Sequence, residues 1–263
     1  FRVEGYLPKF RVGKSKFESG YLIAENPQKK ATIEVRAINY NDNGLKNKVN
    51  VSLDAENDYL NTFISWANNK AETYKADIST TTHFVTVQEA EKRNAKKNLR
   101  TEIAINPTAV VIKDSLWSIA PSNVIIENKT IMIDNFEIGH NQEFALIDGI
   151  VSENPLDTLN LQLKDIELAY IFDVLNIPAL QFSGVANGKF NISDLKESQM
   201  LNTDLNIENF GFNGVTLGRL NLFSEWDHTQ QGIMMLGSIH KNDSVWTDVN
   251  GYIYPIKQGL SLY

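Results

Sequence analysis

The chain has 263 residues and a mass of 29.7 kDa, enough for one large domain or two ordinary ones with a sizeable hydrophobic core. Hydrophobic residues make up 42% and charged residues 22%, which argues against wholesale disorder. The net charge of −7 leaves no basic excess for a nucleic-acid surface. The absence of Cys excludes disulfides, thiolate metal sites and iron–sulfur clusters.

No apolar run approaches the ~18 residues that a membrane-spanning helix needs. The longest runs, such as Ala109 to Ile112, have the length of strands. The chain begins at Phe1, already within a strand-like pattern and without a signal peptide. We therefore expect it to be a piece of a longer protein.

Alternation of apolar and polar residues is the dominant pattern from the first residues onward. Val49, Val51 and Leu53, for example, alternate with polar neighbours. We count about fifteen such runs, each a predicted strand. Turn-forming segments such as 41–44 (NDNG) and 153–155 (ENP) separate them.

The segment from Gln88 to Asn98 (QEAEKRNAKKN) interrupts this pattern. It contains helix-forming residues and a Glu89–Arg93 pair one helical turn apart, but no apolar stripe that could pack against a core. We expect a solvated turn of helix or a mobile loop that caps a hairpin. We divide the chain into residues 1–114, which hold upstream strands, and residues 115–263, which are more regular.

One short helix is expected in the second part, over Glu167 to Leu175 (ELAYIFDVL). Pro178 ends this helix. Four apolar residues fall on one of its faces: Leu168, Ile171, Phe172 and Leu175. The strands on either side alternate cleanly, as in 159–163 and 180–192.

Most connections between the expected strands are too short for helical crossovers, which favours an all-β fold built as a long antiparallel meander. Strands with one apolar side allow two arrangements. Two sheets can pack face to face as a sandwich, or one sheet can curl into a trough. Small residues on the apolar phase, such as Gly184, Gly188 and Gly237, would leave volume and favour the trough. A Gly-kinked sandwich or a β-helix is the alternative.

No residue pattern indicates catalysis. The four histidines, His83, His140, His228 and His240, have no partners at ligand spacing, and no nucleophile, P-loop or zinc-protease motif is present. We therefore expect no enzyme activity, no metal and no cofactor. The four Trp could form a sugar-stacking platform, but we favour ordinary packing for them.

Several segments, taken together, resemble the TamB branch of the AsmA-like proteins, in particular the versions from bacteria of the Bacteroidota type. The resemblance covers 115–263 and rests on 116–119 (LWSI), 131–136 (IMIDNF), 145–152 (ALIDGIVS), the short helix at 168–171, the Gly184-x-x-x-Gly188 strand and the stretch from Trp226 to Gly251. The resemblance lies in the order and spacing of strands and turns, and not in a catalytic motif. Residues 1–114 fit only as upstream strands of the same architecture.

The resemblance implies a taco-shaped β-sheet trough with an apolar interior, located in the periplasm. It implies a bridge-like conduit that carries phospholipid between the inner and outer membranes. An N-terminal helix, absent from this chain, would anchor the protein in the inner membrane, and an outer-membrane barrel-assembly protein would be a partner. We expect no nucleic-acid partner.

The candidate lipid-contacting residues are those on the apolar side of the strands that alternate most regularly. Each of them could equally be an ordinary core residue. They are Leu161, Leu163, Phe182, Ala186, Phe190, Ile192, Leu205, Ile207, Leu220, Leu222, Ile233, Met235, Val249 and Ile253. Two other functions compete with lipid transport. One is a scaffold for outer-membrane protein assembly through exposed sheet edges. The other is a β-sandwich carbohydrate-binding module.

Overall fold

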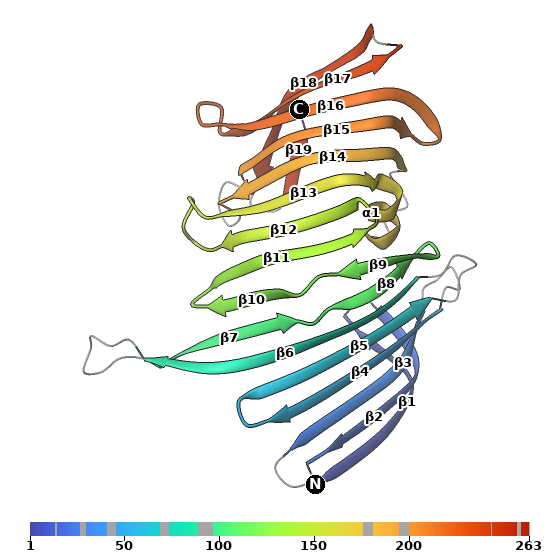
Figure 1. Cartoon of the computed structure of the whole chain (residues 1–263), viewed down its shortest axis with the longest axis vertical. Helices are drawn as coiled ribbons and strands as arrows, with labels where there is room; N and C mark the ends of the chain where they lie inside the picture. The colour runs from blue at the N-terminus through green and yellow to red at the C-terminus, as the bar shows by residue number, and fades with distance from the viewer. Residues whose placement is uncertain are drawn as a thin grey trace. The chain divides into compact units, whose positions relative to one another are not determined.

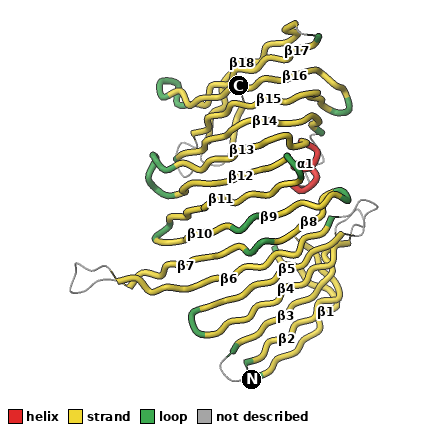
Figure 2. Tube along the Cα trace, in the orientation of Figure 1, coloured by secondary structure: helices red, strands yellow, loops and turns green. Residues whose placement is uncertain are grey.

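The computed structural model describes residues 1–13, 15–26, 30–40, 46–68, 74–88, 97–175, 181–194, 200–242, 244–256 and 259–262. These residues form nineteen strands and one short helix (Figures 1 and 2). They divide into two compact units, unit 1 (Phe1–Asn128) and unit 2 (Lys129–Tyr263). The expected all-β antiparallel meander with one short helix is confirmed.

Unit 1 contains the first ten strands, and each of the first six pairs antiparallel with the next. Their bounds are β1 (Arg2–Val12), β2 (Ser15–Glu25), β3 (Ala31–Tyr40), β4 (Lys46–Glu56), β5 (Tyr59–Asn68), β6 (Lys75–Gln88), β7 (Lys97–Ile105), β8 (Thr108–Ile112), β9 (Ser115–Ile119) and β10 (Ser122–Glu127).

Prolines split two of the longer strands of unit 1. Both β7 and β8 pair with β6, so they form one strand interrupted at Pro107. In the same way β10 pairs with β7 and β9 pairs with β8, and Pro121 separates them. Proline has no N–H to donate to a ladder. At the first break, Asn106 restores the link to β6 by donating its backbone N–H to the Ser79 carbonyl oxygen at 3.0 Å.

Unit 2 is a second antiparallel meander, in which each strand from β11 to β19 pairs with the next. Its elements are β11 (Thr130–His140), β12 (Glu143–Val151), β13 (Thr158–Glu167), α1 (Leu168–Leu175), β14 (Phe182–Ser193), β15 (Met200–Phe212), β16 (Val215–Asp227), β17 (Gly232–Lys241), β18 (Ser244–Ile256) and β19 (Gly259–Leu262).

The structure describes the expected helix and the two strands that flank the charged segment. The helix is confirmed as α1, which lies against β13 and β14 and buries Leu168. The side chains of Phe172 and Leu175, and Pro178, fall outside the described residues. The charged segment joins the paired strands β6 and β7, whose last pair is Gln88 with Lys97. Residues 89–96 between them are not described.

The division between the units falls after Asn128 rather than after residue 114. Strands β9 and β10 pair with β8 and β7, which holds residues 115–127 within unit 1. Sequence alternation does not contain this information, because it assigns strands but not their partners.

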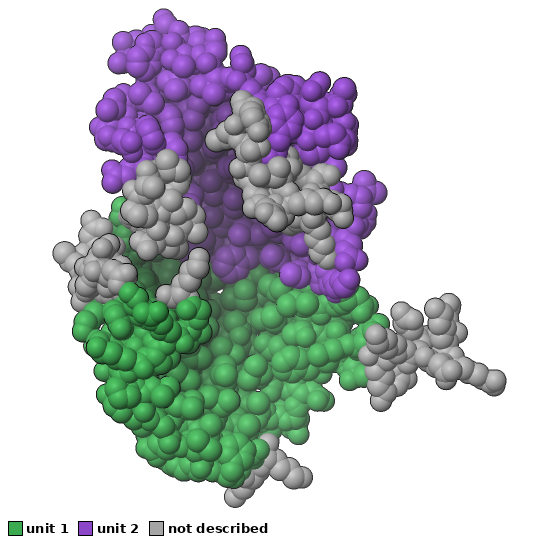
Figure 3. Space-filling view, turned by 180° about the vertical axis from the view of Figure 1, so that it is seen from behind, with its two compact units in different colours: residues 1–128 green, residues 129–263 purple. Residues whose placement is uncertain are grey.

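Each unit is a single sheet with an incompletely buried apolar side. Among the described residues, no large side chain is less than 2% exposed. A face-to-face sandwich would enclose such side chains, and antiparallel pairing excludes a parallel β-helix. Seen from behind, the surface of each unit is hollowed (Figure 3).

Candidate functional site

The strand registers of unit 2 place the predicted lipid-contacting residues on one side of its sheet. Residues directly opposite each other in an antiparallel pair share a face, and residues two apart on one strand share it too. One row of opposed residues crosses six strands from β13 to β18: Leu163, Gly188, Leu205, Leu222, Gly237 and Val249.

Three parallel rows flank this one on the same face. The first holds Leu161, Phe190, Thr203, Ser224, Met235 and Gly251, the second holds Ile166, Ala186, Ile207, Leu220 and Ile239, and the third includes Ile192, Leu201, Trp226, Ile233 and Ile253. We call these four rows the apolar face of unit 2. Thirteen of the fourteen predicted residues belong to it.

Phe182 is the predicted residue that does not join these rows. A register shift between Ser183 and Val185 separates it from the rest of β14. Its ring lies 5.9 Å from that of Phe210 and 5.2 Å from that of Phe212, between centroids. Phe182 therefore packs in an aromatic cluster at the start of β14, beyond a bulge whose extra residue is on β15.

Burial varies along the apolar face. Leu163, Ala186, Leu205, Ile207 and Ile233 are buried. The other predicted residues on the face are half-buried, except Val249, which is 46% exposed. The most buried row contains Ile166, the residue two before α1, so the helix and the most protected part of the face lie together.

The glycines on the apolar face have two different roles. A Cβ at Gly188, whose φ is +158°, would run into the carbonyl oxygen of Asp204 on β15. At Gly237 an added Cβ would meet Leu222 and Val249 at ordinary contact distances of 3.5 Å. Gly188 therefore permits a close approach of two strands, and only Gly237 leaves usable space, in contrast to the expectation that both leave volume.

The opposite side of unit 2 is polar. Its side chains form cross-strand amide contacts, as between Asn206 Nδ2 and Asn221 Oδ1 at 2.7 Å and between Asn191 Nδ2 and Asn160 Oδ1 at 2.7 Å. A hollow of about 500 Å³ opens over β15 to β18. Polar residues such as Asp204 and Asp248 line it together with Phe223 and Leu236, and it also borders the central row of the apolar face at Leu205, Leu222, Gly237 and Val249.

Unit 1 has an apolar face of the same kind, for which the sequence analysis proposed no lipid-contacting residues. One row is Val35, Val51, Ile64 and Ile78, and another is Ala37, Val49, Trp66, Ala76, Val110 and Trp117. The alternation at Val49, Val51 and Leu53 signalled this face. Threonines on β6 concealed its continuation, because Thr80 and Thr82 occupy inward positions between apolar residues.

Several large apolar side chains on this face of unit 1 remain accessible. Ile33, Ile64 and Ile126 are 37–39% exposed, and Leu99 is 58% exposed. The registers place all four on the side that carries Val35 and Val51. The apolar face of unit 1 therefore presents hydrophobic surface that its own residues do not cover.

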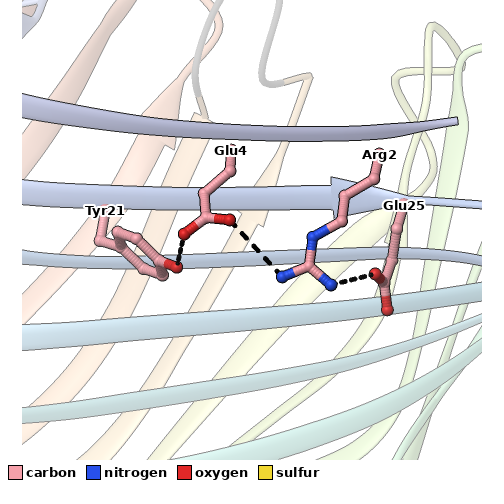
Figure 4. Close-up of polar contacts among 4 residues, drawn as sticks. All are labelled: Arg2, Glu4, Tyr21 and Glu25. Carbon is pink, nitrogen blue, oxygen red and sulfur yellow. Dashed lines mark hydrogen bonds and ion pairs between the residues drawn. The ribbon is translucent and has the colours of Figure 1, made fainter.

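The other face of unit 1 carries polar clusters, of which one joins β1 and β2 (Figure 4). Arg2 Nη1 donates to Glu25 Oε2 at 3.2 Å, and Arg2 Nη2 lies 3.5 Å from Glu4 Oε2. The Tyr21 hydroxyl donates to Glu4 Oε1, which lowers the pKa of the Glu4 carboxyl and raises the pKa of Tyr21. These contacts lie on the surface, so their charged groups are on the side of the sheet opposite the apolar face.

The aromatic and titratable residues do not gather into one centre. Trp66 and Trp117 lie on the apolar face of unit 1, Trp226 lies on that of unit 2, and Trp246 is 56% exposed. In the part of the chain that the structure describes, no group of three or more His, Asp or Glu is arranged to hold a metal ion, and no helix is long and apolar enough to cross a membrane.

The fold and the two faces define a class of all-β proteins built from single antiparallel sheets, apolar on one side and polar on the other. No protein-family model, curated protein or solved structure matches this chain.

Proposed function

We propose that the apolar faces shield phospholipid acyl chains, and that the protein acts in the periplasm as part of a bridge-like conduit between the inner and outer membranes. The observation that carries the proposal is the set of continuous apolar rows on one side of each sheet. The resemblance to the TamB branch of the AsmA-like proteins supports the same function. An inner-membrane anchor outside this chain and an outer-membrane barrel-assembly partner belong to this proposal.

The dimensions of the rows suit an acyl chain. Neighbouring strands lie about 4.8 Å apart, so a row that crosses β13 to β18 spans roughly 24 Å. One leaflet of a bilayer contributes about half of a hydrocarbon core that is about 30 Å thick. A single row is therefore long enough to cover one extended acyl chain.

The energetics favour such a surface over transfer through water. Exposure of an acyl chain costs about 0.8 kcal/mol per CH₂, or roughly 10 kcal/mol for a dozen of them. Non-directional apolar contact removes this cost without any precise arrangement of polar groups. Half-buried residues such as Phe190 and Met235, and the space beside Gly237, provide surface for these contacts.

Val249 and Leu236 provide a matched test because they are similarly exposed, at 46% and 47%, on opposite faces of neighbouring strands. A photoreactive amino acid is introduced at one position at a time, and the protein is irradiated with radiolabelled phospholipid. We expect lipid crosslinks at Val249 and few at Leu236, with bound phospholipid detected by native mass spectrometry. Equal crosslinking at both positions, or none together with no bound lipid, would refute the proposal.

A further inference from the structure

A second hollow, of about 300 Å³, opens in unit 2 where β16 begins and β17 ends, beside Glu208 and Asn209 of β15. Hydrogen-bond donors predominate among the polar side chains that line it. They include the Thr216 hydroxyl, the Arg219 guanidinium, the His240 imidazole and the Lys241 ammonium, and Glu208 provides the one carboxylate. This concentration of cations contrasts with the net charge of −7 on the whole chain.

Strand pairing holds two of these groups together. Arg219 on β16 and His240 on β17 are directly opposite each other, which places their Cβ atoms about 5 Å apart. Ser238 Oγ lies 2.9 Å from His240 Nε2 and so fixes the ring. Lys241 is the next residue and lies 4.9 Å above the ring of Trp246, measured from Nζ to the centroid. Paired strands therefore position the cationic groups.

The cations of this hollow have little compensation from the protein. Within the described residues, Arg219 makes no ion pair or side-chain hydrogen bond, and Glu208 forms no ion pair with it. Arrangements of this kind are stabilised when an anion binds between the donors.

We propose that the Arg219–His240 hollow binds a phosphate-class anion, either inorganic phosphate or the phosphoryl group of a lipid head group. The planar guanidinium of Arg219 matches two phosphate oxygens. The Thr216 hydroxyl supplies a further donor. The site stands on the polar residues of β15 to β17 and does not depend on lipid binding at the apolar face.

The main test is a titration of the whole chain with inorganic phosphate, followed by NMR chemical shifts and calorimetry. Arg219→Ala should weaken binding about tenfold or more, since a hydrogen bond between charged groups is lost. The control is Lys189→Ala, which removes an exposed cation on β14 outside the hollow and should leave affinity unchanged. Equal loss in both variants would overturn the proposal, because it would show non-specific charge attraction.

A parallel titration distinguishes the source of the phosphoryl group. Glycerol phosphate and inorganic phosphate represent free anions, and vesicles with or without phosphatidylglycerol represent lipid head groups. Binding of the small anions, lost in Arg219→Ala, supports a free-phosphate site. Binding only to anionic vesicles, again lost in Arg219→Ala, supports head-group recognition. No saturable binding in either titration would overturn the proposal, whatever the outcome of crosslinking at Val249.

Discussion

At the scale of single residues, two glycines of one row differ in whether their surroundings have room for a Cβ atom. The backbone of β14 at Gly188 lies too close to β15 for any Cβ, while Gly237 has room for one. Glycine within a strand interior otherwise costs about 0.5–1 kcal/mol relative to alanine. The two positions therefore separate close backbone approach from empty volume.

We predict opposite changes in stability for alanine at these two glycines. Gly188→Ala should lower the free energy of unfolding by about 1–3 kcal/mol, because the new Cβ meets a carbonyl oxygen. Gly237→Ala should raise it by about 0.5 kcal/mol. Urea unfolding of both variants measures the difference. A destabilised Gly237→Ala variant would contradict the space assigned to that position.

Asp227 gives one turn a defined pH dependence. The backbone N–H groups of Gln230 and Thr229 donate to its Oδ1, at 3.0 and 2.8 Å, and the Tyr252 hydroxyl donates to Oδ2 at 3.0 Å. These bonds hold the pKa of the Asp227 carboxyl below its ordinary value, and the same contact raises the pKa of Tyr252. The contacts join the turn after β16 to β18.

Because the pKa of Asp227 is lower in the folded protein, its stabilising contribution is present above the unfolded value of about 3.9 and is lost as the pH falls through the folded value. We predict that the amides of Thr229 and Gln230 lose hydrogen-exchange protection in this acidic range. Asp227→Asn should reduce the pH dependence at these two amides. An unchanged profile in Asp227→Asn would show that another group controls the turn.

At the scale of elements, successive residues of β14 alternate between the apolar face and the polar side of unit 2. Phe190 belongs to the apolar face, while its neighbour Asn191 lies on the polar side and donates to Asn160. Leu205 on β15 also faces the apolar side, but it is only 7% exposed, so a charge there would unfold the strand as well as repel lipid. Phe190 is therefore the better position for a charge.

We predict that Phe190→Glu abolishes lipid capture while the strands still form. The matched variant Asn191→Glu places the same charge one residue away on the polar face and should keep lipid binding. Crosslinking to labelled phospholipid measures capture, and far-ultraviolet circular dichroism measures strand content. Undiminished crosslinking to Phe190→Glu would show that the apolar face of unit 2 does not contact lipid.

At the scale of the whole molecule, both units leave large apolar side chains exposed, such as Leu99 at 58% and Val249 at 46%. An apolar surface that remains accessible stabilises the folded protein only when something covers it. A ligand that binds the folded state alone adds about 2.7 kcal/mol when its concentration is one hundred times its Kd. The stability of this protein should therefore depend on lipid.

We predict that the thermal unfolding midpoint rises with the concentration of a short-chain phospholipid kept below its micelle concentration. The Phe190→Glu variant should show a smaller rise than Asn191→Glu. Differential scanning calorimetry measures the midpoint in each case. Equal rises in the two variants would place the lipid elsewhere on the protein.

Several features could be predicted from the sequence because they depend on local chemistry. Alternation predicted the strands and their apolar sides, since side chains point to opposite faces of any strand. Apolar residues at helical spacing, followed by Pro178, predicted the helix. The prediction was incomplete where local order breaks. A bulge on β15 separates Phe182 from the rows of opposed residues, and threonines on β6 hid the apolar face of unit 1.

An antiparallel β protein with one apolar side per strand can be predicted from the amino-acid sequence, because periodicity and turn chemistry are properties of neighbouring residues. Which strands pair, in which register and within which unit becomes known only from the folded chain. Those choices depend on hydrogen bonds between residues far apart in the chain, such as Leu163 with Gly188 and Gly237 with Val249. The strand register aligns the apolar residues of separate strands into rows, and it places Arg219 opposite His240. No local sequence pattern specifies either arrangement.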